Sequence, residues 1–90
     1  MSYSALKLCS GRSAFEALPN PRLALDLPKL KRRIQSEGVP VIDARVMLIA
    51  GRAQEVTIGR DGRILLKVRS ETAAGQLFER VRAWIDDAGS

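Results

Sequence analysis

Residues 54–69 read QEVTIGRDGRILLKVR, and this stretch says more about the fold than any other part of the chain. Two apolar runs flank an Asp-Gly turn, which is typical of a β-hairpin. A two-residue loop would set Ile58 opposite Leu65. A three-residue loop, with Gly62 in the left-handed region, sets Ile58 opposite Ile64 instead. We predict the three-residue loop, because it keeps apolar side chains together and pairs opposite charges across the strands.

The segment before this hairpin, 41–50, is predicted to be extended. It forms either one strand bent near Ala44–Arg45 or two strands divided there. Alternate residues of a strand point to opposite faces of a sheet, so residues of one parity should pack on the core. The even positions are all apolar and are therefore assigned to the core: Ile42, Ala44, Val46, Leu48 and Ala50.

An amphipathic helix is expected on the N-terminal side of these strands. It could begin after Asn20 or after Asp26. A start at Asn20 would place Pro28 inside the helix, at a cost of about 3 kcal/mol. We therefore expect the helix over 27–37, capped by Asp26 and ended by Gly38.

A second helix is expected from Ser70, which can cap it, to about Asp87, with Glu71 at its positive end. Apolar residues recur at three- and four-residue spacings and predict the face that meets the core. These residues are Ala74, Leu77, Phe78, Val81, Trp84 and Ile85.

Toward the N-terminus, 3–8 is expected to form a first strand and 11–20 to be irregular. The residues expected beside the core in this part are Phe15, Ala17 and Leu18. Residues 1–90 therefore form a single domain, in which a strand or loop segment, 1–20, precedes the helix, strands and closing helix of 21–90. The predicted fold class is α+β, an antiparallel sheet of four to five strands with two helices packed on one face.

The composition excludes several kinds of function. The chain has 15 Lys and Arg against 10 Asp and Glu, no histidine, and Cys9 as its single cysteine. An intrachain disulfide, a Cys/His zinc site and a histidine-based triad are therefore impossible. We predict no enzyme, no catalytic residues, no metal and no cofactor, and Cys9 is interpreted as a structural or merely incidental thiol. No apolar run could cross a membrane and no signal peptide is recognised, so the expected location is the cytoplasm.

If both helices cover one face of the sheet, the odd-numbered side chains of the strands remain open to solvent. Large apolar groups among cations on such a face usually mark a binding surface. The predicted contact is with a protein partner or with a second copy of the chain in a homodimer, unless a terminal segment or the residues around Phe15 fold over the face. The residues assigned to this partner-binding face are Arg45, Met47, Ile49, Thr57, Leu65, Lys67 and Arg69, with Glu55 and Arg63 beside them.

The densest group of cations lies on the first helix. Its members are Lys29, Lys31, Arg32 and Arg33. They ring the solvent side of that helix, where they serve either as a solvated face or as phosphate contacts. Nucleic-acid binding through these cations and the same sheet face is thus the alternative function. The net charge of +5 equally fits ordinary solubility.

Several short motifs occur in the order known from one protein family. They are LDL at 25–27, VMLI at 46–49, DGR at 61–63 and SETAA at 70–74. Over about 24–87 this order resembles one repeat of the TATA-binding protein, which implies a fold like half of that protein. In that family two repeats form a saddle that binds the DNA minor groove, and phenylalanines wedge between base steps. A saddle would need a homodimer of this chain, and no Phe or Tyr is expected on its open face.

Overall fold

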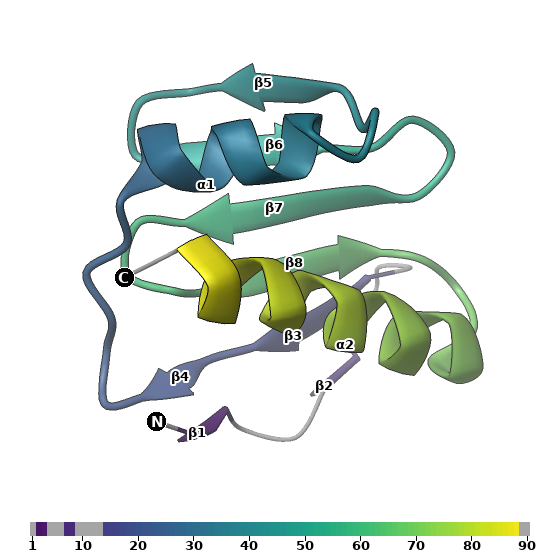
Figure 1. Ribbon diagram of the computed structural model, residues 1–90. Helices are drawn as coiled ribbons and strands as arrows, with labels where there is room; N and C mark the ends of the chain where they lie inside the picture. The colour runs from purple at the N-terminus through teal and green to yellow at the C-terminus, as the bar shows by residue number, and fades with distance from the viewer. Residues whose placement is uncertain (1, 4–6, 9–13, 89–90) are drawn as a thin grey trace.

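The computed structural model describes residues 2–3, 7–8 and 14–88, which form two helices and eight strands (Figure 1). The helices are α1 (Leu27–Gln35) and α2 (Glu71–Ala88). The strands are β1 (Ser2–Tyr3), β2 (Lys7–Leu8), β3 (Phe15–Ala17), β4 (Pro19–Asn20), β5 (Val41–Asp43), β6 (Met47–Ala50), β7 (Glu55–Gly59) and β8 (Ile64–Lys67).

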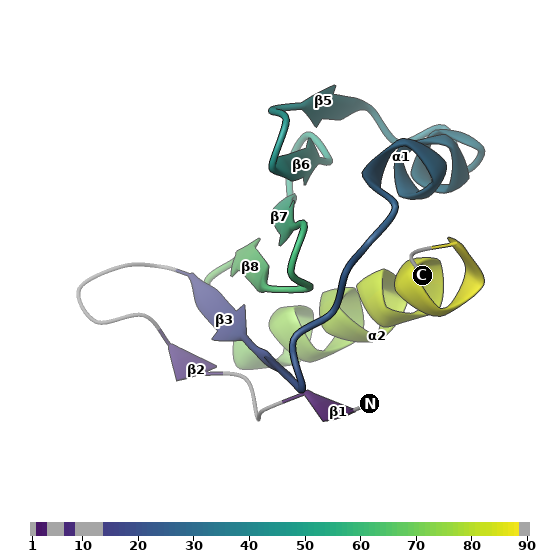
Figure 2. The ribbon, with the colours of Figure 1, turned by 90° about the vertical axis from the view of Figure 1, so that its left-hand side faces the viewer.

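Six strands form one antiparallel sheet in the order β2-β3-β8-β7-β6-β5, and β1 pairs separately with β4. Both helices lie on the same face of the large sheet, with α1 against β5 and β6 and α2 against β8 (Figure 2). The predicted α+β class, an antiparallel sheet with two helices on one face, is confirmed. The two-residue β2 at one edge adds to the four to five strands that the sequence predicts.

The β7–β8 hairpin has the predicted three-residue loop. Ile58 lies opposite Ile64, and Gly62 has a φ of 95°, in the left-handed region that glycine adopts without strain. The Gly59 amide donates a hydrogen bond to the Arg63 carbonyl at 2.7 Å, which closes the loop. This register turns one set of apolar side chains toward the helices and the other set away from them.

The segment 41–50 forms two strands rather than one bent strand. The chain reverses at Arg45, whose φ of 70° is unusual for a residue with a side chain. The Asp43 carboxylate accepts a hydrogen bond from the Arg45 amide at 2.9 Å and fixes this turn. The reversal places Ile42 opposite Ile49, and both side chains lie on the face away from the helices.

This reversal overturns part of the core prediction. Within β6 the even residues are buried as predicted, but Ile42 is 65% exposed and Val46 is 58% exposed. Ala44 is exposed as well. The prediction is wrong because the parity that faces the helices changes at the turn. The β5 residue that packs on the core is Val41, which lies opposite Ala50.

Helix α1 begins at the predicted residue. Asp26 caps it by accepting a hydrogen bond from the Lys29 amide at 3.1 Å, and Pro28 lies in the first turn. The helix ends at Gln35, slightly before the predicted end. Gly38, with a φ of 79°, donates to the Gln35 carbonyl at 2.9 Å and directs the chain back toward the sheet.

Helix α2 begins after Ser70, whose hydroxyl accepts a hydrogen bond from the Ala73 amide at 3.2 Å. The predicted apolar residues form its buried face, apart from Phe78, which is half-buried. The Phe78 ring meets the Tyr3 ring edge-on, with 5.5 Å between the ring centroids. The helix ends at Ala88, close to the predicted end.

The N-terminal segment contributes more to the sheet than the sequence indicates. The strand expected at 3–8 is divided between β1 and β2, which pair in different sheets. The segment 11–20, expected to be irregular, contains β3 and β4. Phe15 lies opposite Leu66 and is buried on the helix side. Phe15 itself therefore does not cover the open face, and residues 9–13 before it lie outside the described residues.

A single core lies between the sheet and the two helices. Its largest fully buried side chain is Trp84, and the strand residues Ala17 and Phe15 join the same cluster. Leu18 is 46% exposed, so its predicted place beside the core is wrong: it follows β3, where the chain leaves the sheet. Cys9 lies outside the described residues.

Candidate protein-interaction face

A row of cross-strand neighbours lies on the side of the sheet opposite the helices. The register places Ile42 beside Ile49, Ile49 beside Thr57, Thr57 beside Leu65, and Leu65 beside Glu16. Directly opposed residues of an antiparallel pair point to the same side of the sheet. Five strands therefore contribute one side chain each to a single row. We call this row, together with the groove beside it, the open face.

A groove of about 600 Å³ follows the open face. Figure 2 shows that both helices lie on the other side of the sheet, so neither covers the groove. Surface apolar groups gathered in this way mark a contact surface. The groove is lined by Val46, Met47, Ile49, Glu55, Thr57, Gly59, Arg60, Asp61, Arg63, Leu65 and Lys67.

Charged side chains of the open face form ion pairs with each other. Lys67 Nζ lies 3.0 Å from Glu55 Oε1, and Arg63 Nε donates to Glu16 Oε2 at 2.8 Å. The charged side chains of the face comprise three cations and three anions, which are Arg60, Arg63, Lys67, Glu16, Glu55 and Asp61. Among the described side chains of the open face the formal charges thus cancel, although the whole chain carries +5.

Most residues assigned to the partner-binding face lie in this groove. Arg45 does not, because it occupies the β5–β6 turn, where it lines a separate hollow of about 390 Å³ with Arg60 beside the start of α1. Arg69 follows β8 and is exposed outside the groove. Both residues lie outside strands, where alternation no longer fixes the direction of a side chain. The groove brings together Met47, Ile49, Thr57, Leu65 and Lys67.

Sequence reasoning missed the hairpin-loop end of the open face, formed by Gly59, Arg60 and Asp61, and three further residues. Ile42 and Val46 were assigned to the core by parity along an unbroken strand, and Glu16 lay in a segment expected to be irregular. Asp43 could have indicated the turn between β5 and β6, because an aspartate side chain that accepts a hydrogen bond from the amide two residues later favours a turn. That contact to Arg45 exists in the structure.

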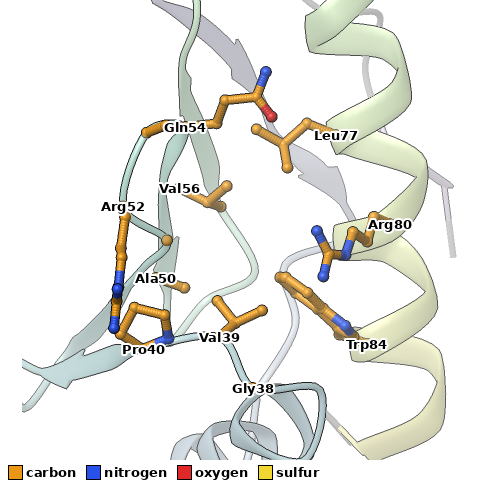
Figure 3. Close-up of a pocket in the computed structure, with 12 residues that line it drawn as sticks. Gly38, Val39, Pro40, Ala50, Arg52, Gln54, Val56, Leu77, Arg80 and Trp84 are labelled. Carbon is orange, nitrogen blue, oxygen red and sulfur yellow. The ribbon is translucent and has the colours of Figure 1, made fainter.

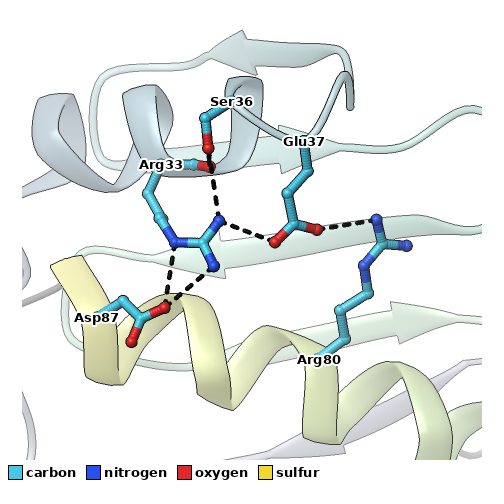
Figure 4. A network of polar contacts seen from close by, with 5 residues as sticks. All are labelled: Arg33, Ser36, Glu37, Arg80 and Asp87. Carbon is cyan, nitrogen blue, oxygen red and sulfur yellow. Dashed lines mark hydrogen bonds and ion pairs between the residues drawn. The ribbon is translucent and has the colours of Figure 1, made fainter.

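The cations of α1 lie in the helix layer, on the other side of the sheet from the open face (Figure 2). Lys29 and Arg32 are exposed, and Lys31 is half-buried. Arg33 differs from them, because its guanidinium points toward α2 and is already bonded there (Figure 4). Of the four predicted phosphate contacts, Arg33 is therefore the one engaged within the protein.

The Arg33 network joins the two helices (Figure 4). Its guanidinium lies 3.0 Å from Asp87 and 2.8 Å from Glu37, and Glu37 lies 3.1 Å from Arg80. Hydrogen bonding to Arg33, with the Trp84 indole and Arg80 beside it, holds the pKa of Glu37 below its usual range. The Glu37 and Asp87 carboxylates raise the pKa of Arg33 in turn.

Within the part of the chain that the structure describes, no group of His, Cys, Asp and Glu side chains is arranged to hold a metal ion. Neither α1 nor α2, the helices of this part, combines the length and apolarity that crossing a membrane requires.

Comparisons with protein-family models, with curated proteins and with solved structures gave no match. The function is therefore argued from the open face itself.

Proposed function

We propose that this protein is a small non-enzymatic binding module that contacts a protein surface through its open face, and that this surface is the open face of a second copy. One observation carries the proposal: the exposed Ile42 and the partly exposed Ile49 and Leu65 lie in one row, which is framed by ion-paired charges. Contact with a matching face would remove Ile42, Ile49 and Leu65 from water. Complete burial of such a side chain stabilises by about 1.5 to 3 kcal/mol.

The paired charges favour a protein partner over a nucleic acid. Phosphate binding needs cations that are free to replace the counterions of the polymer. On the open face, Arg63 and Lys67 each have a carboxylate at hydrogen-bond distance, and binding a phosphate would have to break these pairs. The α1 cations lie on the opposite side of the sheet, so one straight duplex would not reach both surfaces.

The same charges favour a second copy as the partner. A two-fold interface joins identical patches, so the patch must complement itself. A patch with only cations would repel its copy, whereas cations and anions in equal number can re-pair across the axis. Six strands of two to five residues make a face of at most about 24 by 15 Å. This area is smaller than the roughly 800 Å² per partner of a standard interface. We therefore expect weak association, with a dissociation constant of about 10 to 100 µM.

Sedimentation velocity over a concentration series of the intact chain tests this proposal. The mass should rise from the 9.9 kDa of one chain toward twice that value as concentration increases. Leu65→Asp places a charge in the centre of the row and should remain monomeric at every concentration. Arg69→Ser changes an exposed residue outside the groove and should associate like the wild type.

A second arm of the experiment separates the nucleic-acid alternative. Duplex DNA and single-stranded RNA are titrated with the protein at low salt, where phosphate contacts are strongest. If the open face binds protein, any retardation of the nucleic acid should be the same for the wild type, Leu65→Asp and Lys67→Gln. A strictly monomeric wild type, together with salt-sensitive retardation that Lys67→Gln weakens, would replace the protein partner with a nucleic acid.

The fold resemblance to a TATA-binding-protein repeat is part of this proposal. The order of one helix, two strands, a hairpin and a closing helix supports it. In that family the open sheet is the contact surface, and the resemblance implies the same use here. The four aromatic residues, Tyr3, Phe15, Phe78 and Trp84, are buried or partly buried in the core on the helix side. The proposed contact is accordingly apolar and broad, without an aromatic wedge between bases.

A further inference from the structure

Helices α1 and α2 differ in length, and the difference leaves part of the helix-side face of the sheet uncovered. They have 9 and 18 residues, which correspond to about 14 and 27 Å. Glu37, just after α1, contacts Arg80 in the middle of α2, so the first half of α2 extends past the end of α1 (Figure 1). A pocket of about 540 Å³ lies there, between α2 and the ends of β6 and β7 (Figure 3).

The walls of this pocket are largely apolar. Figure 3 shows Leu77 and Trp84 projecting from α2 toward Val39 and Val56 on the strand side. Ala50 of β6 lines the pocket beside Val39, which precedes β5, and Val56 of β7. Small-molecule sites typically have apolar walls and volumes of about 300 to 1,000 Å³, so both the size and the lining fit a small ligand.

The rim of the pocket is cationic. The Arg80 guanidinium lies 5.1 Å from the centre of the Trp84 ring and 3.1 Å from Glu37, and these contacts hold it in place. Arg52 lines the pocket from the exposed loop after β6, where its side chain runs beside Pro40 (Figure 3), and it has no carboxylate within ion-pair distance among the described residues. The described residues that line the pocket include these two arginines and no Asp or Glu.

We infer that this pocket binds a small monocarboxylate with an apolar body, such as a medium-chain fatty acid. The hydrocarbon chain lies against Val39 and Pro40, above the buried Leu77 and Trp84, and the carboxylate lies at the rim within reach of the Arg52 and Arg80 side chains. Guanidinium groups match a carboxylate with two parallel hydrogen bonds, which a neutral alcohol of the same length cannot replace. Arg52, which has no ion-pair partner among the described residues, repels a cationic amphiphile. Arg80 is already paired with Glu37 and contributes less to this selectivity.

Trp84 provides a direct readout, because it is the only tryptophan of the chain and forms a wall of the pocket. Decanoate is titrated into the intact protein while the Trp84 emission is followed, and decanol is titrated in parallel. We expect a saturable change with decanoate, and at least tenfold weaker binding of decanol. The factor follows from one lost charge-assisted hydrogen bond.

Variants of the rim separate a bound carboxylate from general partition into the core. Arg52→Gln should weaken decanoate binding about tenfold and leave decanol unchanged, since Arg52 has no structural partner. Arg80→Gln tests the second cation, and Arg69→Gln, outside the pocket, is the matched control that should bind like the wild type. Three results would overturn the inference. The first is equal affinity of the wild type for decanoate and decanol, and the second is wild-type affinity for decanoate in both rim variants. The third is the absence of a saturable change in Trp84 emission with decanoate.

The pocket lies on the helix side of the sheet, and the inference is therefore independent of the open face. Leu65→Asp, designed to keep the chain monomeric, should bind decanoate with wild-type affinity. A loss of decanoate binding in that folded variant would contradict the placement of the site.

Discussion

Replacing Gly62 with alanine tests the loop that aligns β7 with β8, and this alignment determines which side chains reach the open face. Gly62 has a φ of 95°. A Cβ atom added there would lie 2.9 Å from Pro19 Cγ and 2.9 Å from Leu23 Cδ1. Both distances are shorter than van der Waals contact, and the proline ring cannot rotate away. Alanine therefore meets backbone strain and steric overlap together.

The expected loss of stability is about 3 kcal/mol. A left-handed conformation costs an L-residue about 1 to 2 kcal/mol, and overpacking of a well-packed site typically adds about 1 to 3 kcal/mol. A chain of this length has an unfolding free energy of about 9 kcal/mol at about 0.1 kcal/mol per residue, so about a third of the stability is lost. The melting temperature should fall by about 15 °C.

Urea denaturation measures the difference, and Gly75→Ala is the matched control. Gly75 lies inside α2, and a Cβ atom there would meet nothing within 4 Å. Alanine should stabilise this position by about 0.5 to 1 kcal/mol, because glycine loses more backbone entropy on forming a helix. If Gly62→Ala matched or exceeded the stability of the wild type, the three-residue loop would be incorrect.

Three further substitutions test other contacts. Burial raises the pKa of Tyr3 to about 12, and its neutral phenol donates a hydrogen bond to the Gly62 carbonyl at 2.7 Å. The stabilisation is therefore complete below the unfolded pKa of about 10 and is lost as pH rises toward 12. Urea titrations at pH 9 and 11 should show this loss of stability in the wild type and not in Tyr3→Phe. The pKa of Glu37 is lowered, so the ionised carboxylate stabilises the fold above its unfolded pKa, and this stabilisation is lost as pH falls through the folded pKa. Glu37→Gln should therefore reduce the fall in unfolding free energy on the acid side of a stability–pH curve. An unchanged fall would show that the Arg33 network adds no stability. Asp26→Ala removes the N-cap of α1 and should lower the unfolding free energy, measured by thermal unfolding, by about 1 kcal/mol. An unchanged unfolding free energy would show that the Asp26 cap does not stabilise the helix.

Elements governed by neighbouring residues were predictable from the sequence. The hairpin register followed from its Asp-Gly turn and the need to keep Ile58 opposite an apolar partner, and the structure has that pairing. The start of α1 followed from Asp26 and Pro28, which act within one helical turn. In these cases the signal and its structural consequence lie a few residues apart.

Features that depend on distant partners could not be predicted in this way. Residues 15–17 form a strand because β8 offers them a free edge, and nothing within the segment itself indicates that pairing. The place of Ile42 on the open face depends on one left-handed residue, Arg45, which alternation along a strand cannot anticipate. Arg33 belonged to a cation stripe by local spacing, but its partner Asp87 lies on the other helix.

Concentration-dependent NMR spectra of the wild-type chain test the proposed self-contact of the open face most directly. Amide spectra are recorded from about 20 µM to about 1 mM, a range that spans the expected dissociation constant. Self-association through the open face predicts shifts that grow with concentration and cluster at Ile49, Thr57 and Leu65, while the outer surface of α1 stays constant. Spectra that do not change with concentration, or shifts confined to α1 and α2, would contradict it.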